Sequence, residues 1–350
     1  MEEKILPQFF NESGYATAHF GKWHLGDDEV DDKYSARNRG WSYSIVSNYA
    51  KHFNPNLRVN GKMQKFEGFR TDILFNEAQK WMSGQLKSKK PFFCYIALNS
   101  AHAPLACTPE YKDLYKDNKN ITERSILYYA MVSNIDDNMG RLVEYMKKNK
   151  LYENTVLVYM TDNGHLGNDY NAGMRGSKNS PWRGGSRVPC FFHCPDKFKG
   201  GVEINELGGA LDFLPTVLDL CDIKLDKDVD GVSLAPLLYD NKKTMPERFL
   251  VSHTGRWLHG QAEKGKYNQY AIQNKRYRLV NNDSLYDIET DPGETKNIID
   301  QHPELVKQMR EWYEAWWQKT LPLMCNEQTA VDMGVPNTKV PGERKTKKKK

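Results

Sequence analysis

The sequence predicts an α/β fold, in which a large, mostly parallel sheet is flanked by helices and followed by a small C-terminal subdomain of antiparallel strands and a helix. Two apolar runs, Phe92 to Leu98 and Thr155 to Met160, are suited to buried strands. Thr122 to Lys150, which lies between them, is predicted to be an amphipathic helix. A strand, a helix and a strand in this order are typical of a parallel sheet, whose ligands bind beyond the carboxyl ends of the strands. The apolar residues of the helix recur at helical spacing: Ile135, Met139, Leu142 and Met146.

A second structural unit is predicted to begin near Thr244. A helix with Pro303 near its start follows the turn-rich residues 289–294, and we interpret its apolar stripe as a packing face. The predicted domains are therefore 1–243, 244–328 and a basic tail, 329–350, without a fold of its own. Four short runs are typical of strands: Arg248 to His253, Gln269 to Gln273, Arg276 to Val280 and Ser284 to Ile288. The stripe consists of Leu305, Met309, Trp312 and Trp316.

Charge and hydropathy narrow the classes of partner. The 350 residues carry a net charge of +5, and five of the last six residues are lysines, so the body of the chain is close to neutral. We interpret the tail as a solvated charge run and expect no nucleic-acid partner. No run reaches the roughly 18 apolar residues that a membrane helix needs, and residues 1–7 lack the apolar core of a signal peptide. The six cysteines are too sparse for a disulfide scaffold.

A glycine-bracketed segment near the start carries the first candidate site residues. It runs Gly14-Tyr-Ala-Thr-Ala-His-Phe-Gly-Lys-Trp-His-Leu-Gly26. Lys22 and His24 are two residues apart, so their side chains would point the same way in an extended segment. A cation and an imidazole that converge suit an oxyanion such as sulfate or phosphate. Taken alone, the pair could also be an exposed lysine beside a packed histidine.

Further candidates follow the two buried strands. His102 lies just beyond Phe92 to Leu98, where a histidine can donate a proton to a leaving group near neutral pH. Asp162 and Asn163 follow Thr155 to Met160 and supply hard oxygen ligands that suit Ca²⁺ better than Mg²⁺. An Asp-Asn-Gly triplet alone is more typical of a plain turn, but its partner motifs favour a metal site.

These motifs, in this order, resemble the signatures of the sulfatase family, which belongs to the alkaline-phosphatase-like superfamily. The segment at Lys22 is similar to the family's second signature. Asn99-Ser-Ala-His-Ala-Pro104 resembles its Asn-Ala-Pro-His segment, with Ser100 and Ala101 as departures. The stretch from 176 to 189 resembles a segment in which a lysine, here Lys178, precedes Glu-Gly-Gly and Arg-Val-Pro. Arg183 stands where the family has glutamate. With Leu285-Tyr-Asp-Ile-Glu-Thr-Asp-Pro-Gly-Glu-Thr, similar to the small C-terminal subdomain of sulfatases, the resemblance covers roughly residues 1 to 320.

The resemblance implies a sulfuric ester hydrolase of the arylsulfatase or carbohydrate sulfatase type, acting on a sulfated small molecule or carbohydrate. His102 and Lys178 would bind sulfate and assist departure of the alcohol, while His24 would help the sulfated intermediate to collapse. A calcium ion would polarise the sulfate and the nucleophile. The sulfate would lie among Lys22, His24, His102 and Lys178, beside Ca²⁺ held partly by Asp162 and Asn163.

The resemblance also implies groups that the sequence lacks. Sulfatases use a formylglycine made from Cys or Ser in Cys/Ser-x-Pro-x-Arg. Cys107-Thr-Pro-Glu-Tyr111 lacks the arginine, and Asn179-Ser-Pro-Trp-Arg183 begins with asparagine, so neither is the nucleophile. The family's other two metal carboxylates precede the nucleophile. The remaining acidic pairs, Asp27-Asp28, Asp31-Asp32 and Asp136-Asp137, are interpreted as loop or solvated helix residues.

We therefore expect the family's N-terminal part, with the first strands of the sheet, to be missing, which would leave open sheet edges. The chain alone would bind Ca²⁺ weakly and be inactive. Two alternatives stay open: a phosphoester or phosphonate hydrolase of the same superfamily, or a non-catalytic remnant that at most binds sulfated ligands. Family members are commonly secreted, periplasmic or lysosomal, but the localisation, the oligomeric state and the individual substrate stay unassigned.

Overall fold

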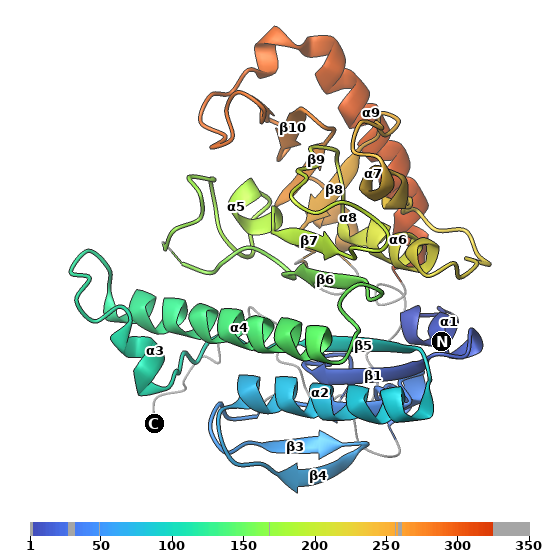
Figure 1. Cartoon of the computed structure of the whole chain (residues 1–350). Coiled ribbons are helices and arrows are strands. Elements are labelled where there is room, and N and C mark those ends of the chain that lie inside the picture. The colour runs from blue at the N-terminus through green and yellow to red at the C-terminus, as the bar shows by residue number, and fades with distance from the viewer. Residues whose placement is uncertain are drawn as a thin grey trace, which may run out of the picture. The chain divides into compact units, whose positions relative to one another are not determined.

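The computed structural model describes residues 3–26, 32–48, 50–167, 169–255, 257 and 261–324 (Figure 1). The described residues divide into two compact units. The first lies within Met1–Leu157, Phe192–Ile204 and Gly208–Lys243, and the second within Val158–Phe191, Asn205–Leu207 and Thr244–Lys350. The predicted basic tail, 329–350, and the acidic residues Asp27, Asp28 and Asp31 lie outside the described residues.

A five-stranded sheet forms the centre of the first unit, with the strand order β4-β3-β2-β1-β5. β1 pairs in parallel with both β2 and β5, and Gly21, the last residue of β1, is in register with Val46 and Ala97. The carboxyl ends of these three strands therefore lie at one edge of the sheet. The strands are β1 (Ala16–Gly21), β2 (Tyr43–Val46), β3 (Asn56–Val59), β4 (Lys62–Lys65) and β5 (Phe92–Ala97).

Helices cover both faces of this sheet. Figure 1 shows α2 (Arg70–Ser88) and α4 (Glu123–Lys148) beside the sheet. Ala18, Phe20 and Ile45 of the sheet belong to one buried cluster with residues of these two helices. On the other face, Phe10 of α1 (Leu6–Glu12) stacks on Phe93 of β5 with ring centroids 4.4 Å apart. The shorter helices of the unit are η1 (Arg37–Arg39), α3 (Pro109–Asp113), η2 (Ala210–Asp212), α6 (Phe213–Leu220) and α7 (Ala235–Tyr239).

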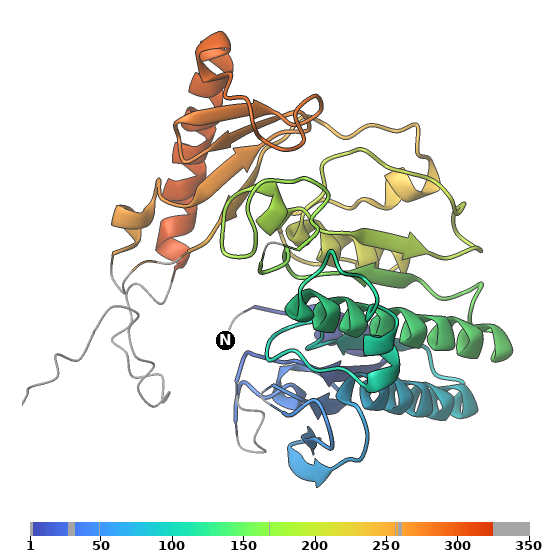
Figure 2. The ribbon, with the colours of Figure 1, turned by 90° about the vertical axis from the view of Figure 1, so that its left-hand side faces the viewer.

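An antiparallel sheet and a long helix form the core of the second unit. Its strand order is β11-β10-β9-β8. Figure 2 shows α9 (Pro303–Thr320) along one face of these strands, where Met309, Tyr313 and Trp317 are fully buried. The strands are β8 (Leu250–His253), β9 (Tyr270–Gln273), β10 (Tyr277–Val280) and β11 (Ser284–Asp287). The short helices are α5 (Arg183–Ser186), α8 (Ala262–Gly265), η3 (Ile299–Gln301) and η4 (Leu321–Leu323).

The predicted α/β class is confirmed, with two differences in detail. The apolar run from Thr155 contains β6 (Leu157–Met160), but within the described chain β6 pairs only with β7 (Cys190–His193), in a separate two-stranded sheet. An apolar run identifies a strand but not its partner, because pairing joins segments that are distant in sequence. The second difference is that β3 and β4 form an antiparallel hairpin at the sheet edge. β4 is exposed at every position and so has no apolar pattern.

No helix among the described residues is both long and apolar enough to cross a membrane.

Candidate active site

The exits of β1 and β5 bring three of the predicted site residues to one edge of the first unit's sheet. Lys22 follows the last residue of β1, and its backbone N–H donates to the carbonyl of Ala97 at 2.7 Å. His24 comes two residues later. His102 lies five residues beyond β5, where its N–H donates to the carbonyl of Asn99 at 2.8 Å. The half-buried Lys22 and the exposed His24 and His102 therefore lie in neighbouring loops.

Asn48, just beyond β2, joins these loops. Its Oδ1 accepts hydrogen bonds from the backbone N–H groups of Trp23 at 2.7 Å and His24 at 2.9 Å. Its carbonyl accepts from Nδ2 of Asn99 at 3.3 Å. His24 has a φ of 51°, a left-handed conformation that is uncommon outside glycine, and the bond from Asn48 helps to hold it. Asn48 was not predicted from the sequence, because nothing local marks it as a partner of residues 24 or more positions away.

A buried arginine and a histidine hold the loop of His102. Nη2 of Arg70 lies 3.3 Å from Nδ1 of His52, and Nε2 of His52 lies 2.9 Å from the carbonyl of Pro104. Since the guanidinium can only donate, Nδ1 of His52 accepts, and Nε2 carries the proton that goes to Pro104. Burial and then the charge of Arg70 lower the pKa of His52, which keeps the ring in this neutral form. Thr71, next to Arg70, also contacts Ser100 through the two hydroxyls at 2.8 Å.

His102 is oriented through one ring nitrogen. Its Nδ1 lies 2.7 Å from the carbonyl of Ala103, so Nδ1–H is the donor of that bond. In the imidazolium form, Nε2–H is then the proton that His102 can give to another group. This arrangement suits the predicted role of a general acid.

Asp162 and Asn163 lie in a tight turn beyond β6, in the second unit. Asp162 is exposed, and Asn163 uses its Nδ2 to donate to the carbonyl of Gly164 at 2.9 Å. The N–H of Gly164 donates to the carbonyl of Gly185 at 3.0 Å. A Cβ at position 164 would lie 1.8 Å from the carbonyl oxygen of Gly184, so only glycine allows this close approach.

Lys178 lies on the segment that packs beside this turn. Its N–H donates to the carbonyl of His165 at 2.8 Å, and its side chain is half-buried. Nε2 of His165 in turn lies 2.6 Å from Oδ2 of Asp169, and both side chains are nearly inaccessible. The second unit therefore gathers Asp162, Asn163 and Lys178 on adjoining segments. The pair of His165 and Asp169 was not predicted, because a spacing of four residues brings side chains together in a helix and neither residue lies in one.

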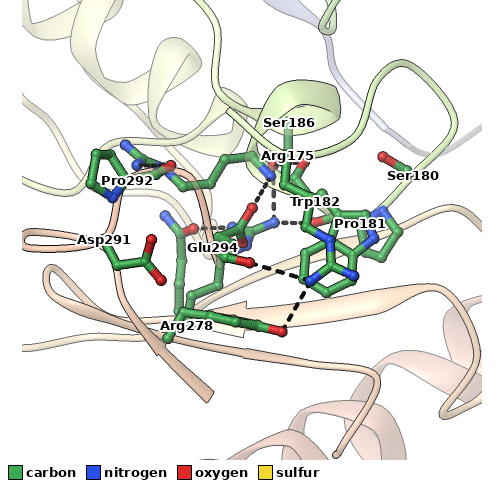
Figure 3. Close-up of polar contacts among 12 residues, drawn as sticks. Arg175, Ser180, Pro181, Trp182, Ser186, Arg278, Asp291, Pro292 and Glu294 are labelled. Carbon is green, nitrogen blue, oxygen red and sulfur yellow. Dashed lines mark hydrogen bonds and ion pairs between the residues drawn. The ribbon is translucent and has the colours of Figure 1, made fainter. Parts of the chain in front are cut away.

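Arg183 occupies the position of the family's glutamate. A carboxylate from elsewhere in the second unit, that of Glu294, bonds to the segment that carries Lys178 and Arg183. Oε2 of Glu294 accepts from the backbone N–H of Arg183 at 2.9 Å. The side chain of Arg183 donates through Nη1 to the carbonyl of Pro292 at 2.8 Å. The segment thus has a carboxylate partner, which comes from a residue more than 100 positions later (Figure 3).

The donor types of the candidate metal site fit Ca²⁺, but their number does not fill a coordination shell. The side chains of Asp162 and Asn163 offer at most three oxygens, and calcium usually takes 6 to 8. Within the described ranges, no three His, Cys, Asp or Glu side chains converge in a way that could hold a metal ion. Asp136 and Asp137 are exposed on α4, in agreement with their interpretation as a solvated helix face.

Cys107 does not have the environment of a nucleophile. Burial raises the pKa of its thiol, whereas nucleophilic cysteines have a lowered pKa. Its motif also lacks the arginine, so the local environment and the sequence agree.

Two family models match the chain. Residues 2–223 match the model described as Sulfatase. Residues 180–318 match the model described as N-sulphoglucosamine sulphohydrolase, C-terminal.

Similar curated proteins carry sulfatase names. The chain is 28% identical to the uncharacterized sulfatase YdeN of Escherichia coli over 369 residues, which covers 89% of the chain and 65% of that protein. It is 27% identical to the ulvan-active sulfatase of Formosa agariphila, with 85% of the chain and 62% of that protein covered. For arylsulfatase J of Mus musculus the identity is 24%, with 85% of the chain and 54% of that protein covered. The chain thus spans between about half and two thirds of the length of these relatives.

Two solved structures share the fold. The crystal structure of Ps i-CgsB in complex with k-i-k-neocarrahexaose matches with a TM-score of 0.79 and 27% identity, over 89% of this chain and 74% of that chain. The structure of BT4656 with D-glucosamine-2-N,6-O-disulfate matches with a TM-score of 0.75 over 94% of this chain and 84% of that chain. At 18% identity, this second likeness shows the fold alone. Since the Sulfatase model matches well over half of the sequence, the chain belongs to the sulfatase family, whose fold is alkaline-phosphatase-like.

Proposed function

We propose that the whole protein hydrolyses a sulfate ester of a carbohydrate, and that Lys22, His24, His102 and Lys178 bind the sulfate. The observation that supports the proposal is the edge of the first unit's sheet, where Lys22 bonds to the end of β5 and where Lys22, His24 and His102 lie in neighbouring loops. Ps i-CgsB, which is 27% identical, was crystallised with an oligosaccharide, and other similar proteins are named for carbohydrate substrates. These likenesses favour a sulfated carbohydrate over a simple aryl sulfate.

The proposed roles follow from the chemistry of each side chain. Lys22 and Lys178 neutralise the charge of the sulfate oxygens through their ammonium groups. His102, held through Nδ1 by the carbonyl of Ala103, protonates the departing alcohol oxygen from Nε2. His24, which is exposed beyond β1, would move a proton to or from the nucleophile that the whole protein supplies.

Asp162 and Asn163 would supply two of the oxygen ligands of Ca²⁺, which when bound polarises the sulfate oxygens. The remaining ligands and the nucleophile have no candidates among the motifs of this sequence. The proposal therefore concerns the whole protein, and we expect these 350 residues alone to show no turnover.

The test is hydrolysis of 4-nitrophenyl sulfate, and then of sulfated oligosaccharides, by the protein translated from its complete gene. His102→Ala should lower kcat by about 10² to 10⁴, the usual effect of removing a general acid. Lys178→Ala should lower kcat by about 10² to 10³, the usual effect of removing a group that stabilises developing negative charge. Lys112→Ala is the matched control, because Lys112 is an exposed lysine paired with Glu123 at 3.2 Å on α3 and α4. Full activity of the His102→Ala and Lys178→Ala variants would contradict the assigned roles.

Two outcomes would replace the proposal by the alternatives. Faster hydrolysis of 4-nitrophenyl phosphate than of the sulfate would indicate a phosphoester hydrolase. Binding of a sulfated oligosaccharide without any turnover would indicate a non-catalytic protein.

A further inference from the structure

An ion pair is buried in the second unit, at some distance in sequence from all the predicted site residues. Nε of Arg278, on β10, lies 3.1 Å from Oε1 of Glu294, and the two side chains are 2% and 0% exposed. Burial lowers the pKa of Arg278 to about 10, while the charge of Glu294 opposes this loss. A buried ion pair contributes little net stability, but breaking it leaves an uncompensated charge at high cost. The pair therefore constrains where its neighbours can lie.

Those neighbours belong to one segment, residues 175–187 (Figure 3). Arg278 donates through Nη2 to the carbonyl of Pro181 and, at 3.0 Å, to Oγ of Ser186. Oε2 of Glu294 accepts from the backbone N–H of Arg183 at 2.9 Å, at the start of α5. The ion pair thus contacts the segment on both sides of Trp182.

Arg175 fixes the other end of the segment. Its Nη1 donates to the carbonyl of Glu294 and to the hydroxyl of Tyr286, both at 3.2 Å. Its guanidinium lies over the ring of Trp182, 3.7 Å from the centroid. Trp182 in turn packs against Tyr286 in an edge contact, with ring centroids 5.6 Å apart.

The segment held in this way is the one that carries Lys178. Within it, the N–H of Gly184 donates to the carbonyl of Arg175 at 2.8 Å. The segment also touches the turn of Asp162 and Asn163, because Lys178 bonds to His165 and Gly185 bonds to Gly164. A Cβ at Gly184 would lie 2.2 Å from the carbonyl oxygen of Gly176, so the backbones have no room to shift independently. These bonds form a continuous path from Glu294 through the segment to Lys178 and to the Asp-Asn turn.

We propose that Glu294 and Arg278 are positioning residues, which hold Lys178 in register with Asp162 and Asn163. This inference rests on the proposed function, since Lys178 acts in catalysis only if the whole protein is a sulfatase. Glu294 and Arg278 bond to each other and to residues 181–186, so they act through this segment. Misplacing a catalytic group by about 1 Å can cost 10²-fold in rate.

The first test measures position without activity, by hydrogen exchange of this chain. Glu294→Gln keeps the size of the side chain but removes its charge. Backbone amides of Gly164, Lys178 and Gly184 should then exchange at least 10-fold faster. Asp287→Asn is the matched control, because Asp287 pairs with Arg276 at 2.7 Å in the same sheet and has no contact to residues 175–187 among those described. In that variant the three amides should exchange as in the wild type.

The second test measures coupling to Lys178 in the whole protein. Glu294→Gln should lower kcat/KM by about 10². In the Lys178→Ala background, Glu294→Gln should lower kcat/KM by about tenfold or less, because one of the two groups that it positions is already gone. If Glu294 were merely structural, Glu294→Gln would lower kcat/KM by the same factor in the wild-type and the Lys178→Ala backgrounds.

The outcomes separate this inference from the proposed function. Unchanged exchange of the three amides, or equal losses in both backgrounds, would overturn the positioning role. The Glu294→Gln variant could exchange faster while the wild-type protein hydrolyses no sulfate. That result would keep the role of Glu294 in holding the segment and reject the proposed function. If Glu294→Gln fails to fold, the double variant Arg278→Met with Glu294→Leu replaces the buried charges by apolar groups. Normal exchange of residues 175–187 in that folded variant would overturn the inference, and faster exchange would support it.

Discussion

His19 is a polar residue that the fold buries without giving it a function in the candidate site. It lies on β1, only 1% exposed, and its ring meets the rings of Trp23, Trp41 and Tyr95 at centroid distances of 5.4 to 5.5 Å. Burial lowers the pKa of His19 from 6.5 to about 4, against a smaller opposing effect of the backbone at Lys22. Lys22 and His24, three and five residues later, stay accessible because they lie beyond the end of the strand.

The buried imidazole makes the stability of the first unit depend on pH. Between pH 6.5 and the lowered pKa, the unfolded chain binds a proton that the folded chain does not, so the free energy of unfolding falls as the pH falls. By pH 5 the loss should be roughly 2 kcal/mol. His19→Phe should remove most of this loss in urea unfolding at about pH 7.5 and pH 5. Ala18→Gly, on the opposite face of β1, is the control and should lower stability equally at both values. The same acid loss in His19→Phe would show that other groups cause it.

At the scale of elements, the apolar pattern predicted several of the helices and strands, whereas the polar contacts between them were not predicted. It found β5, α4 and the four strands of the second unit, because each has an apolar face. On α9 it placed the stripe one residue away at three of four positions, since the buried set is Val306, Met309, Tyr313 and Trp317. Both the predicted stripe and the buried stripe contain aromatic residues at helical spacing, so spacing alone could not show which of the two is buried. The apolar pattern also missed the β3–β4 hairpin, whose sequence signal is the Asn60-Gly61 turn, with φ values of 51° and 84°.

Helix α4 shows why polar positions on a buried face are hard to predict. Asn134 and Asn138 are fully buried on it, and both donate through Nδ2 to Oδ1 of Asp72 on α2, at 2.9 and 2.7 Å. Asparagines in a helix pattern are typical of its exposed side, and only the partner carboxylate makes their burial favourable. The helix could therefore be predicted from the sequence, but not how it bonds to its neighbour.

The start of α4 offers a direct test of helix capping. Thr122 is its N-cap, and its hydroxyl accepts from the N–H of Ser125 at 3.1 Å. Thr122→Ala should lower the free energy of unfolding by about 1 kcal/mol, because this N–H loses its acceptor. Thr122→Ser keeps the oxygen and should change stability by no more than a few tenths of that amount. Equal losses in the two variants, measured by urea unfolding, would mean that the threonine methyl group is responsible.

At the scale of the whole molecule, the order of the motifs could be predicted from the sequence, but the residues that hold the motifs in place could not. Local patterns identified the residue types of Lys22, His24 and His102 because each lies in a recognisable motif. Their partners come from far along the chain: Asn48 bonds to His24, and His52 bonds to Pro104 beside His102. Such contacts exist only once the sheet has aligned the strand ends. A calcium site that uses Asp162 and Asn163 would likewise need ligands from more than one segment.

Calcium binding should therefore be weak in these 350 residues and strong only in a protein that also supplies the other ligands. A ligand at 100 times its Kd stabilises the folded state by about 2.7 kcal/mol. The side chains of Asp162 and Asn163 alone offer too few oxygens to bind calcium that tightly. We expect about 1 mM Ca²⁺ to raise the Tm of the whole protein by at least about 3 °C and that of this chain by less than about 1 °C. Asp162→Asn should abolish most of the larger shift, while Asp136→Asn, at an exposed carboxylate on α4, should leave it intact. Equal shifts for both lengths of protein, or a full shift in the Asp162→Asn variant, would remove Asp162 from the calcium site.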